Sequence, residues 1–300
     1  MIFNRNQFFY TLMIGALFFM WSCGGSGSKE TATEAETNEF ESAEEQVSAQ
    51  IDRIVHELPP PSEVPLLLQQ VGADFNSSVT NDIEKVENYQ TNEKAAINLG
   101  IYATDVGYYA SYEQVQDALK YMEGCQNLAD YLGISSSFDV NLLRRFEQNI
   151  GNRDSLAVLV NEAMEMAEAQ LENNDRNTIA ALALVGSYIE GLYISTQVVK
   201  NYPTDLPPEV RNLVLEPLMR LIADQQAPLL DLIGVLNSME HDQVVDDISR
   251  EIGALRFYFE EIGDFEAKIS ADAANVVLDE GLLKGVTDEV ERIRTEIISI

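Results

Sequence analysis

Apolar residues recur at every third or fourth position along most of the chain after residue 42, which is the spacing of one face of an α-helix. The clearest example spans 115–132, where the apolar positions are Val115, Ala118, Leu119, Met122, Cys125, Ala129 and Leu132. Alternating apolar and polar positions bounded by hairpin turns, the pattern of a strand, are not found. The sequence therefore predicts an all-α fold, an irregular antiparallel helical bundle or solenoid of about 10–11 helices with short connections.

Local signals predict where some of these helices begin and end. Ser111 followed by Gln114 has the spacing of a capping box and predicts the start of the helix over 115–132. Leu132-Gly133-Ile134 predicts its end, with glycine in a left-handed conformation and a hydrophobic contact beside it. Thr287 is expected to cap the last helix of the chain.

The longer apolar stretches predict how the body is organised. Residues 178–199 are apolar on all sides, which is typical of a buried central helix. A helical pattern near 210–222 continues across Pro217, and 241–267 is expected to form one long helix. Three prolines lie within 201–208, the best internal boundary. We expect a helical domain over 42–300, built either as one unit or as two lobes that meet near 201–208.

Residues 1–22 have the form of a secretory signal, with Arg5 as the single charge and an apolar run of about 14 residues. The run ends in Met20-Trp21-Ser22-Cys23, and a small residue before a cysteine at this place resembles the lipobox of bacterial lipoproteins. Met20 and Trp21 depart from the usual pattern. The resemblance implies that Cys23 is lipidated, becomes the first residue of the mature chain, and anchors it to the outer membrane of a bacterial cell envelope.

Two other interpretations of this segment remain open. Cys23 could be an ordinary cysteine near a conventional cleavage site, or the apolar run could stay as an uncleaved anchor. Residues 23–41 are predicted to be an acidic, disordered tether, since they bury too little apolar surface to offset the entropy of ordering. Whether the body faces the periplasm or the cell surface is left open, because five Gly and Ser residues separate Cys23 from the acidic stretch.

The chain carries 50 acidic residues against 19 basic ones, a formal charge of −31. Residues 24–50 contribute −6 (seven Glu against one Lys), residues 51–200 contribute −13 (22 acidic, nine basic), and 201–300 contribute −13 (21 acidic, eight basic). Such a chain cannot hold nucleic acid through its phosphates. The expected partners are therefore the membrane, through the lipid on Cys23, and a protein that the sequence does not identify.

Two helices rich in small residues provide the candidate polar site. The first contains Gly100-Ile101-Tyr102 before Asp105, and the second contains Gly186-Ser187-Tyr188, Glu190 and Gly191-Leu192-Tyr193. Glycine within a helix costs about 1 kcal/mol relative to alanine, so its clustering suggests that two helices approach closely. The candidate site residues are Asp105, Glu190, Tyr102, Tyr188 and Tyr193. Either they line a small site for a cation, an amine or a sugar, or the acids are structural groups that fix the register of the helices.

Other chemistries find little support in the sequence. His56 and His241 do not belong to a zinc or di-iron spacing, so no metal site and no cofactor are predicted. Cys125 occupies an apolar position, where a buried, inert thiol is expected. The motifs of serine hydrolases, phosphate-binding loops and dinucleotide-binding folds are absent.

Several stretches resemble a group of uncharacterised helical envelope lipoproteins of Bacteroidetes-type bacteria, namely 61–63, 98–105, 132–134, 145–147, 152–156 and 186–193. The similarity spans roughly residues 60–205. It implies an α-helical fold and an envelope location, and it brings no activity or catalytic residues. The favoured hypothesis is a lipid-anchored, non-enzymatic interaction or binding module. The alternatives are an envelope hydrolase that uses carboxylates such as Asp105 and Glu190, and a lipoprotein that binds a small ligand or a cation.

Overall fold

A computed structural model describes residues 49–51, 53, 63–70, 72–134, 140–149, 152–172, 176–203, 205–239, 243–278 and 281–299. Within these ranges the chain forms eleven α-helices and two short 3-10 helices, and no strand. Residues 47–300 make up one compact unit. The predicted all-α bundle is therefore confirmed, whereas the signal segment, Cys23 and the tether lie outside the described residues.

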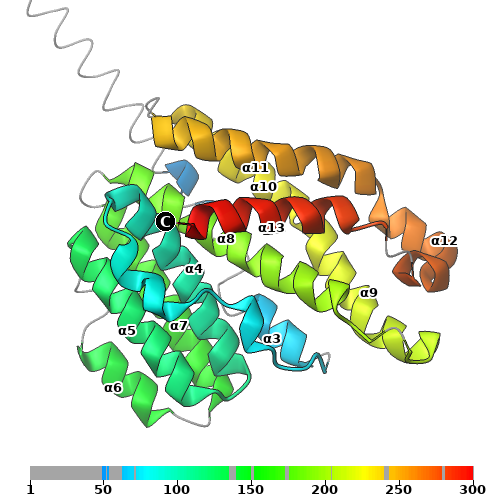
Figure 1. Ribbon diagram of the computed structural model, residues 1–300, viewed down its shortest axis with the longest axis horizontal. Coiled ribbons are helices and arrows are strands. Elements are labelled where there is room, and N and C mark those ends of the chain that lie inside the picture. The colour runs from blue at the N-terminus through cyan, green and yellow to red at the C-terminus, as the bar shows by residue number, and fades with distance from the viewer. Residues whose placement is uncertain are drawn as a thin grey trace, which may run out of the picture. The chain divides into compact units, whose positions relative to one another are not determined.

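The helices follow one another closely along the chain. They are α3 (Glu63–Gln70), η1 (Ser77–Val79), η2 (Ile83–Asn88), α4 (Asn92–Ser111), α5 (Val115–Leu132), α6 (Val140–Gln148), α7 (Arg153–Glu172), α8 (Asn177–Lys200), α9 (Pro208–Asp224), α10 (Gln226–Ser238), α11 (Gln243–Ile262), α12 (Phe265–Leu278) and α13 (Lys284–Ile298). Figure 1 labels the α-helices. The chain passes through Pro217 without leaving α9, as the sequence predicts.

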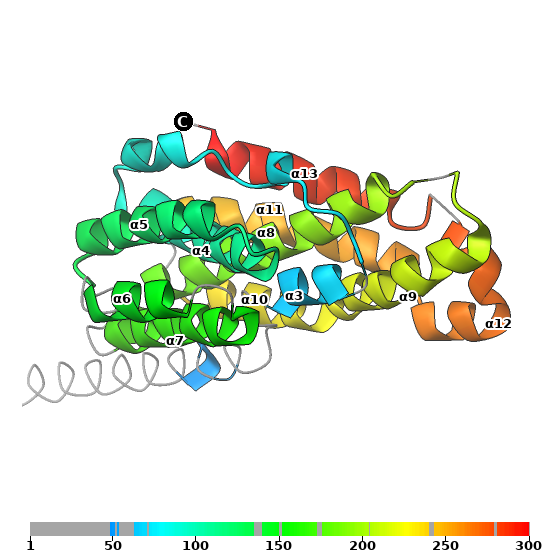
Figure 2. The same ribbon diagram turned by 90° about the horizontal axis from the view of Figure 1, so that it is seen from below.

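Helices α4 and α8 form the centre of the bundle and make the most extensive contact between any two elements. Every residue of α4 from Ala95 to Ser111 is buried, and α8 is buried over most of its length, as its all-round apolar sequence predicts. Both helices lie between α7 on one side and α13 on the other (Figure 2). The apolar stretch of α8 is long enough to cross a membrane, but 83% of its most apolar window is buried inside the bundle.

The two central helices touch backbone to backbone. A Cβ atom on Gly186 would lie 1.8 Å from the carbonyl oxygen of Ile97, and a Cβ on Gly100 would lie 1.9 Å from that of Ala183. No side chain fits in either place. One turn along, the Thr104 and Ser187 hydroxyls are hydrogen-bonded at 3.1 Å. The close approach that the glycines predict is present.

Tyrosines of α4 and α5, together with Tyr112 between these helices, bond to the segment 73–82, which has no α-helix of its own. The hydroxyls of Tyr112, Tyr121 and Tyr102 donate to the carbonyl oxygens of Ala73, Asn81 and Asp82 at 2.8, 2.6 and 2.9 Å. The Tyr108 hydroxyl accepts from the backbone N–H of Asn76 at 2.9 Å. These bonds satisfy backbone groups that have no helical partner, which a partly buried loop requires.

Some predicted helix boundaries are correct and others are wrong. Gly133 ends α5 with φ of 74°, and the Ile134 N–H donates to the Ala129 carbonyl at 2.9 Å. In contrast, Ser111 belongs to the end of α4, where its hydroxyl bonds to Gly107, so it does not cap α5. Thr287 lies inside α13 and bonds to Leu283. The helix expected over 241–267 is broken at Gly263, where φ is 65° and α12 begins shortly after.

Candidate functional site

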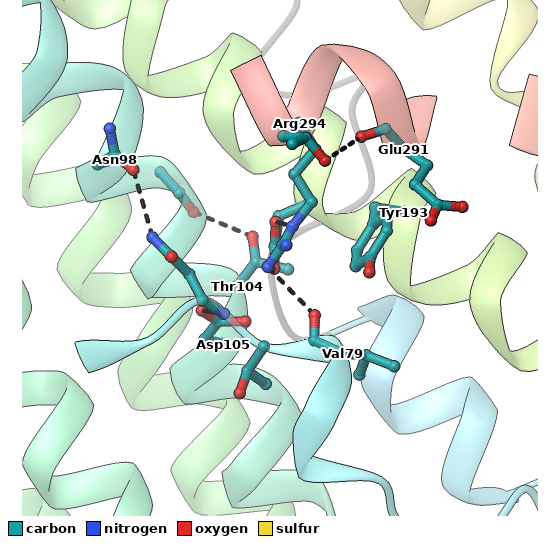
Figure 3. Close-up of polar contacts among 12 residues, drawn as sticks. Val79, Asn98, Thr104, Asp105, Tyr193, Glu291 and Arg294 are labelled. Atoms are coloured by element: carbon teal, nitrogen blue, oxygen red, sulfur yellow. Dashed lines mark hydrogen bonds and ion pairs between the residues drawn. The ribbon is translucent and has the colours of Figure 1, made fainter. Parts of the chain in front are cut away.

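The crossing of α4 and α8 brings Asp105 and Glu190 together in the interior. Both side chains are 0% exposed, and Figure 3 shows the surrounding contacts. Glu190 lies one turn beyond Gly186, and Asp105 lies five residues beyond Gly100, next to Thr104, which contacts α8. The sequence-based pairing of the two acids therefore matches their placement.

Arg294 of the C-terminal helix α13 supplies the positive charge that pairs with Glu190. Its Nε and Nη2 atoms donate to the two Glu190 carboxylate oxygens at 2.6 and 2.7 Å, a bidentate pair. Nη2 also donates to the Val79 carbonyl at 3.2 Å, and the guanidinium lies 4.2 Å from the centre of the Tyr193 ring. In Figure 3 the Arg294 side chain passes Tyr193 on its way to Val79. The pair thus joins α8, α13 and the segment 73–82.

Asp105 is held as the neutral partner of this charged pair. Burial raises the pKa of its carboxyl group well above the ordinary value, and the charge of Glu190 and a hydrogen bond between the two carboxyls raise it further. The Asn81 N–H donates to Oδ2 at 3.1 Å and opposes this shift, as does Arg294. Among the described residues, Oδ1 of Asp105 has no hydrogen-bond partner.

The tyrosines named with the two acids serve different parts of the fold. Tyr193 lies under Arg294, whereas the Tyr102 hydroxyl is used on the Asp82 carbonyl. The Tyr188 hydroxyl donates to the Gln225 carbonyl at 3.0 Å, where α9 meets α10, and does not join the acids. Cys125 is buried, and burial raises the pKa of its thiol, so the thiolate needed for nucleophilic chemistry is disfavoured. Cys23 lies outside the described residues.

Arg294 is the charged partner of Glu190 that the sequence interpretation missed. It follows Val286, Val290 and Ile293, which are all buried, and lies four residues after Val290 on the same helical face. A charged residue at an apolar position of a helix signals a buried partner, and this signal was available in the sequence.

The geometry gives this cluster a structural character. A substrate has no route to carboxyl groups that are fully buried, and the Glu190 oxygens are both occupied by Arg294. Glycoside chemistry needs a pair of carboxyl groups that flank a bond of the sugar, with one of them free to transfer a proton. The arrangement of Asp105 and Glu190 offers neither access nor a free nucleophile.

A groove on the surface lies next to this cluster and is lined by the same helices. Its volume is about 360 Å³, within the range of small-molecule sites. The groove floor is aliphatic and comes from α4, α8, α11 and α13, with Ile97, Leu182, Val244, Ile248, Ile293 and Ile297. Ile293 immediately precedes Arg294, so the Glu190–Arg294 pair fixes the position of the α13 part of the groove.

Charged side chains surround the floor. This groove rim consists of Glu93, Lys94, Asp247, Arg250, Glu251 and Glu296. A concave apolar surface with a few polar groups at its edge is the usual form of a ligand site. Among the described residues no group of His, Cys, Asp and Glu side chains has the arrangement of a metal site.

Comparison of the chain with protein-family models, with curated proteins and with solved structures finds no match in any of the three.

Proposed function

We propose that the protein is a lipid-anchored, non-enzymatic binding module of a bacterial cell envelope, held at the outer membrane through Cys23, with its ligand in the groove between α4, α8, α11 and α13. The observation that carries the binding role is the groove itself, where an aliphatic floor from four helices is open at the surface. The buried Glu190–Arg294 pair supports this role, because it positions α13, which forms one groove wall. The lipobox-like sequence before Cys23 supports the anchor.

The anchor predicts a simple change on mutation. Replacing Cys23 with Ala removes the thiol that would carry the lipid, so the chain should accumulate as a precursor or as a soluble form. Acyl chains contribute about 0.8 kcal/mol for each buried CH₂ group, and two or more chains hold a protein stably on a membrane. Partition of the full-length protein between aqueous and detergent phases measures this. Cys125→Ala is the matched control, because Cys125 is buried in the body. Equal partition of the Cys23→Ala variant and the wild type would exclude the anchor.

The binding role predicts that the apolar floor alone can hold an amphiphile, so that even an uncharged one should bind in the groove. The titration uses a chain of residues 24–300, which retains the compact unit of residues 47–300. Decyl maltoside, kept below its micelle-forming concentration, should bind it at a single saturable site in a titration followed by NMR. Val244→Asn should weaken binding about tenfold, since the floor loses a branched apolar side chain whose burial contributes about 1.5 kcal/mol.

Phe257→Asn is the matched control for this titration. Phe257 lies on the same helix, α11, is 59% exposed and does not line the groove. Its replacement should leave the affinity unchanged. If no saturable binding occurs, or if both variants weaken binding equally, the groove is not the binding site and the proposed function is wrong.

A further inference from the structure

The charges around the groove favour a positively charged ligand. The groove rim has four carboxylates and two cations. One of these cations, Arg250, is held by Asp247 at 2.8 Å and by Glu251 at 3.7 Å. Arg292, outside the lining, bonds Glu251 and also Glu296, the latter at 3.0 Å. Arg292 also bonds Glu289 at 2.8 Å, so counting both of these residues gives five acids against three bases, a net charge of −2.

The rest of the body strengthens this preference. Residues 51–200 and 201–300 each carry a net charge of −13, and a groove within such a body lies in a negative potential. The chain's own tether (residues 23–41), with five Glu and one Lys and hence a net charge of −4, and a second copy of the protein are both acidic and are disfavoured as occupants on this ground. An anionic amphiphile is disfavoured in the same way.

We propose that the groove binds a small amphiphilic cation, a molecule with an aliphatic portion and an ammonium group at one end. This inference rests on the proposed function and adds the class of ligand. The aliphatic portion lies on the floor beside Ile97, Leu182 and Val244 and leaves water there, while the ammonium group stays at the rim near Glu93 and Glu296. The volume of about 360 Å³ suits a single small molecule.

The test compares three probes with the same alkyl chain on the chain of residues 24–300: decyltrimethylammonium, decyl maltoside and decyl sulfate, each below its micelle-forming concentration. Decyltrimethylammonium should bind about tenfold more tightly than decyl maltoside at low salt, and decyl sulfate should bind most weakly. The preference for the cation should shrink as salt is added, because exposed charges are screened. Val244→Asn should weaken the binding of the cation and of the maltoside by the same factor.

Variants that remove rim carboxylates test whether these groups cause the preference for a cationic ligand. Glu93→Gln combined with Glu296→Gln should remove most of the preference for the cation and leave the affinity for decyl maltoside unchanged. Glu260→Gln combined with Glu261→Gln removes the same charge from exposed positions of α11 outside the groove and should preserve the preference. If cation and maltoside bind equally, or if the sulfate binds best, the ligand class is wrong while the binding role stands. If none of the probes binds at the groove, the proposed function fails with it.

Discussion

Replacing Gly186 with Ala should destabilise the protein by about 3 kcal/mol or more, although the change adds one methyl group. The new Cβ would lie 1.8 Å from the Ile97 carbonyl oxygen and 2.8 Å from the carbonyl carbon. Both are backbone atoms, so no side chain can turn away and the helices must separate. Separation weakens the contact between the two helices that carry Asp105 and Glu190, and shifts Ile97 and Leu182 in the groove floor. Urea unfolding followed by circular dichroism measures the loss.

Gly191 provides the matched control on the same helix. It is buried in α8, and the nearest atom to a Cβ built there is Cγ2 of Val64 at 3.9 Å, an ordinary contact. Gly191→Ala should therefore stabilise the protein by about 0.5–1 kcal/mol, the amount by which alanine favours a helix over glycine. If the two variants lose the same stability, general intolerance of side chains in α8 explains the result and the backbone contact does not.

Signals within a few residues of each other predicted the local structure well. Leu132-Gly133-Ile134 ended α5 as expected, since the left-handed glycine and the bond back to Ala129 depend only on neighbouring residues. The capping box at Ser111 failed because the same residue could end the preceding helix, where its hydroxyl found Gly107. Two helices in sequence compete for the residues between them, and packing decides which one extends.

Contacts between distant residues lay beyond a single sequence. The glycines of α4 and α8 indicated that two helices meet, and the acids beside them were placed correctly as a pair. Arg294 is 104 residues from Glu190, and no local pattern states which acid it meets. The Tyr188 hydroxyl likewise reached Gln225, since the face of a buried helix on which a residue lies does not identify the neighbour on that face. The residue types in the sequence thus located the two buried acids. Their pairing with Arg294 became known only from the position of α13 in the structure.

Replacing the two buried acids by their amides should change the stability of the protein by very different amounts. Asp105→Asn should change stability by less than about 1 kcal/mol at low pH, because the amide resembles the protonated acid and can donate to Glu190. The folded pKa of Asp105 is raised, so the folded state binds more protons than the unfolded state once pH rises above the ordinary value of 3.8. Wild-type stability therefore falls from that pH up to the raised pKa, and Asp105→Asn should abolish this part of the fall. Unfolding curves at a series of pH values measure it. If this decline persists in Asp105→Asn, Asp105 is not its source.

Glu190→Gln should be the most damaging isosteric change in the cluster, with a loss of about 3–5 kcal/mol, because it leaves the Arg294 guanidinium buried without its counter-charge. Arg294 is 6% exposed and cannot move to water without carrying α13 with it. Asp105 can ionise in place of Glu190, since the like charge that opposed its ionisation is gone, so the loss should lie near the lower end of that range. Adding Asp105→Asn to Glu190→Gln removes this substitute, and the double variant should lose more stability than the two single changes together. Additive losses would show that the two carboxyl groups do not share a proton or a counter-charge.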